Sequence, residues 1–206
     1  MTEVAANIRD KARQYFAENR LSSDDKTRIS LFLQSVKSTN ATILSKIELQ
    51  PIDWLPYKHL HTQYYKDIEH STLLAKATAW SFNPMLYMEA TQINLNLWQN
   101  AEITKYLGEF FDKNQTFYEY LALSHAFMSE LRILALLPPD FDLNDPFIHC
   151  LHEIDQENSR QIQTQVRMLK DMDITLSDEE KQNIVDSMHS IIADAFDELL
   201  AAIVKR

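Results

Sequence analysis

The stretch NDPFIHCLHEIDQENSRQIQTQVRMLKDM, residues 144–172, decides the fold. Asn144 or Asp145 can cap a helix, and Pro146 suits the first helical position, where its missing N–H costs nothing. Beyond the cap, residues three or four apart form one line that is apolar at both ends and polar in its middle. That line consists of Ile148, His152, Asp155, Ser159, Ile162, Val166 and Leu169. The pattern predicts a long helix with polar residues where a core helix normally carries leucine or isoleucine.

The chain contains a single glycine in 206 residues. Hairpins, bulges and Gly-rich phosphate loops need positive φ angles, which glycine usually supplies. We therefore expect an all-α fold and exclude Walker-type and GxGxxG nucleotide-binding folds. The length fits one domain over residues 1–206, in which residues 1–58 could form an N-terminal helical subdomain.

Hydrophobic periodicity predicts a bundle of about seven helices. The expected segments are 3–19, 22–47 with a break at 38–40, 59–79, 84–99, 117–137, 144–172 and 178 to nearly the C-terminus. The 84–99 segment is the most apolar, so we expect it at the centre of the bundle. Its polar stripe of Glu89, Gln92, Asn96 and Gln99 either faces solvent or lines an internal cavity.

Two motifs of the form Ser/Thr-x-x-Glu predict helix starts, one from Thr116 to Glu119 and one from Ser177 to Glu180. The second motif opens an amphipathic C-terminal helix. Such a helix either closes the bundle or pairs with its twin in a homodimer.

The formal net charge is −10, and it is unevenly distributed: residues 1–58 hold nine Lys/Arg against seven Asp/Glu, and the remainder holds eleven against twenty-three. This acidic balance argues against nucleic-acid partners. No apolar run approaches the ~18 residues of a membrane span, and no signal peptide opens the chain, so we expect a cytoplasmic protein without membrane contact. The only cysteine, Cys150, excludes an internal disulfide and Cys-cluster metal sites.

Two helices carry polar residues that need partners if their face is buried. In the 59–79 helix we expect Leu60, Tyr64, Ile68 and Leu74 to face inward. Asp67 and His70 form either a surface pair or half of a metal site. Glu130 lies among apolar helical neighbours. Its carboxylate needs a cation such as Arg132 or a lysine on another helix, or its pKa rises.

The candidate site residues are His149, His152 and Asp155, at successive i, i+3 positions, together with Glu89 and Glu130. We expect His149, His152 and Asp155 to share a sector of one helix and to be the candidate metal ligands. Carboxylates with imidazoles bind iron or manganese. Glu89, Glu130, His152 and Asp155 are the candidates for binding an organic ligand. The alternative is a polar helix middle that faces water.

The segments DPF at 145–147 and HEIDQEN at 152–158 resemble the late helix of haem-oxygenase-like proteins, which include TenA-like and iron-dependent members. Iron-binding members show His, an acid four residues on, and His three further. Asp155 matches the acid, but Leu151 and Asn158 occupy the two histidine positions, and His152 is one residue out of register. The resemblance implies a haem-oxygenase-like or similar orthogonal bundle that has lost its metal or binds an organic molecule.

FAEN at 16–19 and the apolar spacing of residues 32–47 resemble the DNA-binding part of TetR-type regulators. Lys37 stands where the turn glycine usually sits, and no aromatic–His–Phe signature follows. An ordinary helical corner is the alternative.

The sequence is therefore compatible with three functions. The first is a non-catalytic, regulatory or binding protein for a small apolar molecule or a protein partner. The second is a haem-oxygenase-like metal-dependent oxidoreductase or a degenerate relative, and the third is a TetR-like DNA-binding regulator. The nucleophile motif GxSxG and the zinc motif HExxH do not occur in the chain.

Overall fold

A computed structural model describes residues 3–46, 55–78, 85–86, 88–93, 113–172 and 175–205. Its named elements are α1 (Glu3–Glu18), α2 (Ser23–Lys46), α3 (Leu55–Thr78), α6 (Lys113–Glu130), the 3-10 helix η1 (Ile133–Leu136), α7 (Pro146–Asp171) and α8 (Asp178–Val204). The described residues include no strand. The predicted all-α bundle is confirmed.

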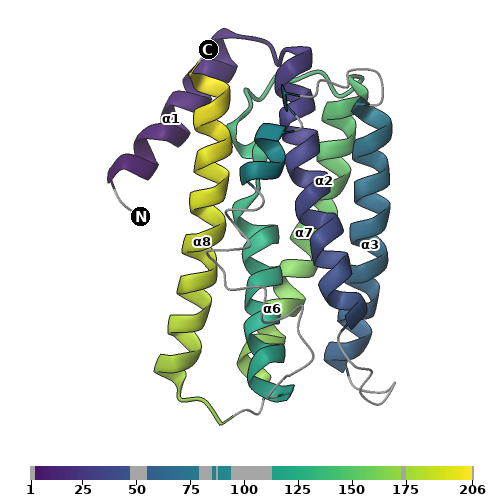
Figure 1. The fold of residues 1–206 in the computed structure, drawn as a ribbon, viewed down its shortest axis with the longest axis vertical. Helices are drawn as coiled ribbons and strands as arrows, with labels where there is room; N and C mark the ends of the chain where they lie inside the picture. The colour runs from purple at the N-terminus through teal and green to yellow at the C-terminus, as the bar shows by residue number, and fades with distance from the viewer. Residues whose placement is uncertain are drawn as a thin grey trace.

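Figure 1 shows α2, α3, α6, α7 and α8 running side by side along the long axis, with α1 inclined against the upper part of α8. α2 packs on α3, α3 on α7, α7 on α6, α6 on α8 and α8 on α1. The haem-oxygenase-like or similar orthogonal form of the bundle stays a prediction. α8 closes the bundle.

One hydrophobic core holds the named helices together, and both N-terminal helices contribute to it. Ala12 and Phe16 of α1 and Phe32 of α2 lie in the same cluster as residues of α6, α7 and α8. The largest fully buried side chains include Phe32, Tyr120, Leu121, Leu123, Phe147 and Ile192. The first two helices therefore share their packing with the rest of the bundle.

Two predicted helix starts are confirmed. Asp145 caps α7, where its side chain accepts hydrogen bonds from the backbone N–H groups of Phe147 (2.9 Å) and Ile148, and Pro146 follows it. Ser177 and Glu180 form a reciprocal capping box at the start of α8. In both cases local side chains satisfy N–H groups that a helix start leaves open.

Two other predicted boundaries are wrong. α2 continues without a break through residues 38–40, and α6 begins at Lys113, so Thr116 lies inside a helix rather than at its cap. Around the expected break, Lys37 and Asn40 both bond the buried Asp67, which holds this turn of α2 in the bundle. A continuous α2 removes the turn on which the resemblance to a DNA-binding motif depended.

The predicted inward face of α3 is confirmed at Leu74, which is buried, and wrong at Ile68. Ile68 is 43 % exposed, whereas Asp67 and His70 are 1 % and 4 % exposed. The expectation that Asp67 and His70 form a surface pair therefore fails. The buried line of α3 is mostly polar and consists of His59, Gln63, Asp67, His70 and Leu74.

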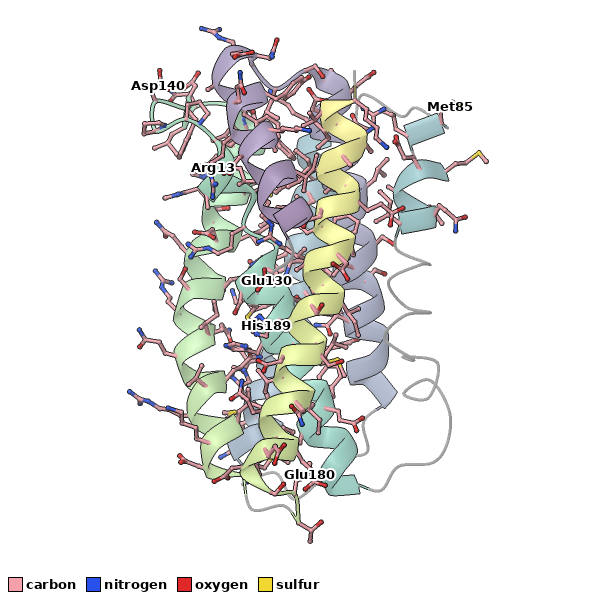
Figure 2. All side chains as sticks on the ribbon, turned by 90° about the vertical axis from the view of Figure 1, so that its left-hand side faces the viewer. Arg13, Met85, Glu130, Asp140, Glu180 and His189 are labelled. Atoms are coloured by element: carbon pink, nitrogen blue, oxygen red, sulfur yellow. The ribbon has the colours of Figure 1, made fainter. Side chains whose placement is uncertain are left out.

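The structure describes only residues 85–86 and 88–93 of the expected central helix, and the connector at 51–54 and Gly108 lie outside the described residues. Leu86 and Ile93 are buried, but Met85 and Met88 are 73 % and 67 % exposed. Figure 2 shows Met85 pointing away from the bundle. In these two turns the helix buries one side only, unlike the enclosed helix that was predicted.

Replacing Asp145 with alanine should lower the free energy of unfolding by about 1–2 kcal/mol, because α7 loses its N-cap. The Asp145→Asn variant keeps a capping oxygen and loses only the partly exposed ion pair with Lys26. We expect it to cost less than about 1 kcal/mol. Urea unfolding of both variants measures the difference, and equal losses would show that the cap contributes nothing.

Candidate functional site

The interior between α2 and α3 contains a buried carboxylate with three hydrogen-bond donors. Asp67 accepts from the Lys37 Nζ and the Gln63 Nε2, each at 2.9 Å, and from the Asn40 Nδ2. The lysine forms an ion pair with Asp67 inside the bundle. Charge-assisted bonds of this kind are short and strong, and burial makes them costly to break.

The network extends from Asp67 to two further helices. The Tyr120 hydroxyl of α6 donates to the Asn40 Oδ1 at 2.6 Å, and Tyr120 also bonds Ser124. The Gln165 Nε2 of α7 donates to the Ser124 Oγ at 3.0 Å. A chain of buried side chains therefore crosses α7, α6, α2 and α3, and such connected bonds polarise one another.

Burial sets the protonation of the neutral members of this region. It raises the pKa of Tyr120 well above its usual value, so the phenol keeps its proton. Burial, with the nearby Lys37 and Lys66, lowers the pKa of His70 to about 3, and burial also lowers the pKa of His59. Both imidazoles are therefore neutral at pH 7. The charges that remain around Asp67 are its own and that of Lys37, and they balance.

A cavity of about 30 Å³ lies beside this network. By volume it has space for about two water molecules. Its polar lining consists of Lys37, Asn40, Gln63, Asp67, Ser124, Asp155 and Asn158, and its apolar lining includes Val36, Phe127, Leu151 and Ile154. The Gln63 Oε1 is buried and has no hydrogen-bond partner. The Gln63 Nε2 donates to Asp67. Exchanging the nitrogen and oxygen of this amide would place the oxygen against the carboxylate, so the orientation of the side chain is fixed.

The predicted metal residues of α7 do not meet at one point. His149 has 58 % of its side chain exposed and lies 3.6 Å from Glu153, measured from Nε2 to Oε1. His152 bonds Gln156, and Asp155 binds Arg132 through two hydrogen bonds of 3.0 and 3.1 Å. Among the residues that the structure describes, no group of three or more His, Cys, Asp or Glu could hold a metal ion.

Helix geometry explains why these residues diverge. Each i, i+3 step turns by about 300°, so three such residues spread over about 120° of the helix surface. The expected polar middle of His152, Asp155 and Ser159 is not buried, and other polar residues of α7 face the core. These buried residues are Asn158, Gln161 and Gln165. The apolar Leu151 and Ile154 precede them on the same face.

The two predicted glutamates have cation partners in other helices. The Glu89 Oε2 accepts from the Arg28 Nε at 2.6 Å. Glu130 binds Arg9 of α1 and His189 of α8, and neither of these partners was predicted. Arg132, the expected partner, binds Asp155 instead.

Glu130 belongs to a second polar cluster, which joins α1, α6 and α8. The Glu130 Oε1 lies 2.8 Å from the His189 Nδ1, and the His189 Nε2 lies 2.9 Å from the His125 Nδ1. Figure 2 shows Glu130 and His189 near one another beside α8. The His189 hydrogen bond lowers the pKa of Glu130, and burial followed by the charge of His189 lowers the pKa of His125. Arg9 also binds Asp197 at 2.8 Å and so fastens α1 to this cluster.

The network around Asp67 was not predicted from the sequence, although a sequence pattern indicates it. His59, Gln63, Asp67 and His70 recur at helical spacing, just as the polar middle of 144–172 does. Two helices with polar lines of this kind, facing each other across a core, predict a buried hydrogen-bond network.

Comparison of the chain with protein-family models, curated proteins and solved structures finds no match in any of the three. In the described part of the chain, no helix is both long enough and apolar enough to cross a membrane. The site geometry is therefore the basis for the functional argument.

Proposed function

We propose that this chain is a non-catalytic binding protein whose ligand occupies the cavity between α2, α3, α6 and α7. One observation carries the proposal: Gln63 lines this cavity, and its buried Oε1 has no hydrogen-bond partner. An unpaired buried polar group costs about 1–3 kcal/mol. A ligand that donates to this oxygen would recover that free energy on binding.

The lining of the cavity supports binding of a ligand with both polar and apolar parts. Polar side chains, most of them from α2 and α3, and apolar side chains, most of them from α6, α7 and η1, line it together. Ligand sites commonly combine an apolar wall with a few well-placed polar groups. The balanced charges of Lys37 and Asp67 favour a ligand without net charge.

The other two functions have less support. Asp155, Leu151 and Asn158, which the haem-oxygenase-like resemblance places at an iron site, all line the cavity. Asp155 is the only acid or imidazole among them, and its carboxylate is bonded to Arg132. A TetR-like role lacks the helix break it needs. A cytoplasmic location and a homodimer through the C-terminal helix remain predictions.

A fragment screen by two-dimensional NMR tests the proposed function. We expect some neutral fragments to shift the amide signals of Ser124, Ile154 and Asn158, which line the cavity, with dissociation constants of about 1 mM. The Asn158→Phe variant should fill the cavity and abolish these shifts. Asn183→Phe, at an exposed position of α8, should leave them unchanged. If no fragment moves the cavity signals of the unmodified protein, the proposal is wrong.

A further inference from the structure

The cavity beside Asp67 also restricts the chemical class of its ligand. We propose, on the basis of the proposed function, that the ligand presents a small primary amide group, whose N–H bonds the Gln63 Oε1 and whose carbonyl oxygen accepts from the Lys37 Nζ. The charge of the cavity wall, its hydrogen-bonding atoms and its size all favour such a group.

The charge of the wall selects a neutral group. Lys37 and Asp67 form a buried ion pair, so their charges cancel. Asp155 is the remaining ionised residue in the lining, and Arg132 neutralises it through two hydrogen bonds. A bound carboxylate or ammonium would add an uncompensated charge to the interior, which is strongly unfavourable.

The hydrogen-bonding atoms select a group that is both a donor and an acceptor. The Gln63 Oε1 is an acceptor without a donor, and its orientation is fixed because the Nε2 of the same side chain is bonded to Asp67. The Lys37 ammonium has three N–H groups and gives one of them to Asp67. A primary amide carries an N–H donor and a carbonyl acceptor on one carbon and therefore matches both atoms.

The size and the apolar wall limit the remainder of the ligand. The volume of about 30 Å³ has space for about two water molecules, so it admits an amide group and little more. Phe127, Leu151 and Ile154 are among the apolar residues of the lining. They favour a short hydrocarbon substituent over a second polar group.

Three probes of nearly equal size test this inference: acetamide, acetone and acetate. Acetone lacks the N–H donor, and acetate adds a negative charge. Titration of the full chain, followed through the NMR signals of the Gln63 and Asn40 side-chain amides, gives a dissociation constant for each probe. We expect acetamide to bind at least tenfold more tightly than either of the other two.

A variant pair assigns the effect to Gln63. Gln63→Met should weaken acetamide binding at least tenfold, whereas Gln163→Met, at an exposed position of α7, should not change it. If Gln63→Met does not fold, the comparison of the three probes on the unmodified protein decides the question. Equal binding of acetone and acetamide in the cavity would overturn the amide inference and leave the proposed function standing. If no probe or fragment shifts the cavity signals, water is the occupant and both proposals fail.

Discussion

Replacing Asp67 with asparagine should lower the free energy of unfolding by about 3–5 kcal/mol. The loss arises because Lys37 keeps its charge inside the bundle while its counter-ion disappears. Lys37→Met should cost a similar amount, since it leaves the carboxylate buried without a cation. Urea unfolding of each variant measures both losses.

The double variant and a surface pair provide the controls. Lys37→Met combined with Asp67→Asn removes both charges, so we expect it to be less destabilised than the sum of the single variants, with a coupling of about 1–3 kcal/mol. The Lys66–Glu69 pair lies on the exposed side of the same helix. Glu69→Gln should therefore cost less than about 1 kcal/mol. If Asp67→Asn costs no more than Glu69→Gln, Asp67 is not buried with its partner as described.

Lowering the pH from about 7.5 to about 5 should remove roughly 2 kcal/mol of stability through His70 alone. The pKa of His70 is lowered to about 3 in the folded protein, from 6.5 in an unfolded chain. Between these two values the unfolded state binds a proton that the folded state does not, so acid favours unfolding. The contribution of His70 is fully present above pH 6.5 and declines as the pH falls below it.

Two histidine variants isolate this effect. His70→Gln should flatten the dependence of the unfolding free energy on pH, because the glutamine does not titrate. His61→Gln, at an exposed position of the same helix, should leave the dependence unchanged. A weaker slope should persist in His70→Gln, since His59 and His125 also have lowered pKa values. Parallel curves for the unmodified protein and His70→Gln would show that His70 is accessible to protons in the folded state.

The fold class and several helix ends were predictable because they depend on local chemistry. A chain with one glycine lacks the residues that hairpins and phosphate loops require. The cap at Asp145 and Pro146 involves neighbours in the sequence, so its signal is visible without a structure.

The polar part of the inward face of α3 was not predictable from hydrophobicity, because long-range hydrogen bonds decide it. Apolar periodicity placed Ile68 inside, but Asp67 is the buried residue. Its partners Lys37 and Asn40 lie about thirty residues earlier, on a different helix. Their donors compensate for the desolvation of a carboxylate that would otherwise stay at the surface.

Of the predicted site residues, Asp155 lines the cavity between α2, α3, α6 and α7, and Glu89, Glu130, His149 and His152 do not. The buried polar residues of the 144–172 helix are others than those predicted. Leu151 and Asn158 lie on the inward side, each about 100° around the helix from its neighbour His152 or Ser159. Glu130 was correctly expected to need a partner. His189 was missed because it lies 59 residues away, beside the apolar face of α8.

A crystal structure of the chain grown with acetamide tests the central claim most directly. The account predicts an intact Lys37–Asp67 ion pair between α2 and α3, and electron density for the amide in contact with the Gln63 Oε1 and the Lys37 Nζ. A structure in which Asp67 faces solvent, or in which a protein donor satisfies the Gln63 Oε1 and closes the cavity, would contradict the account.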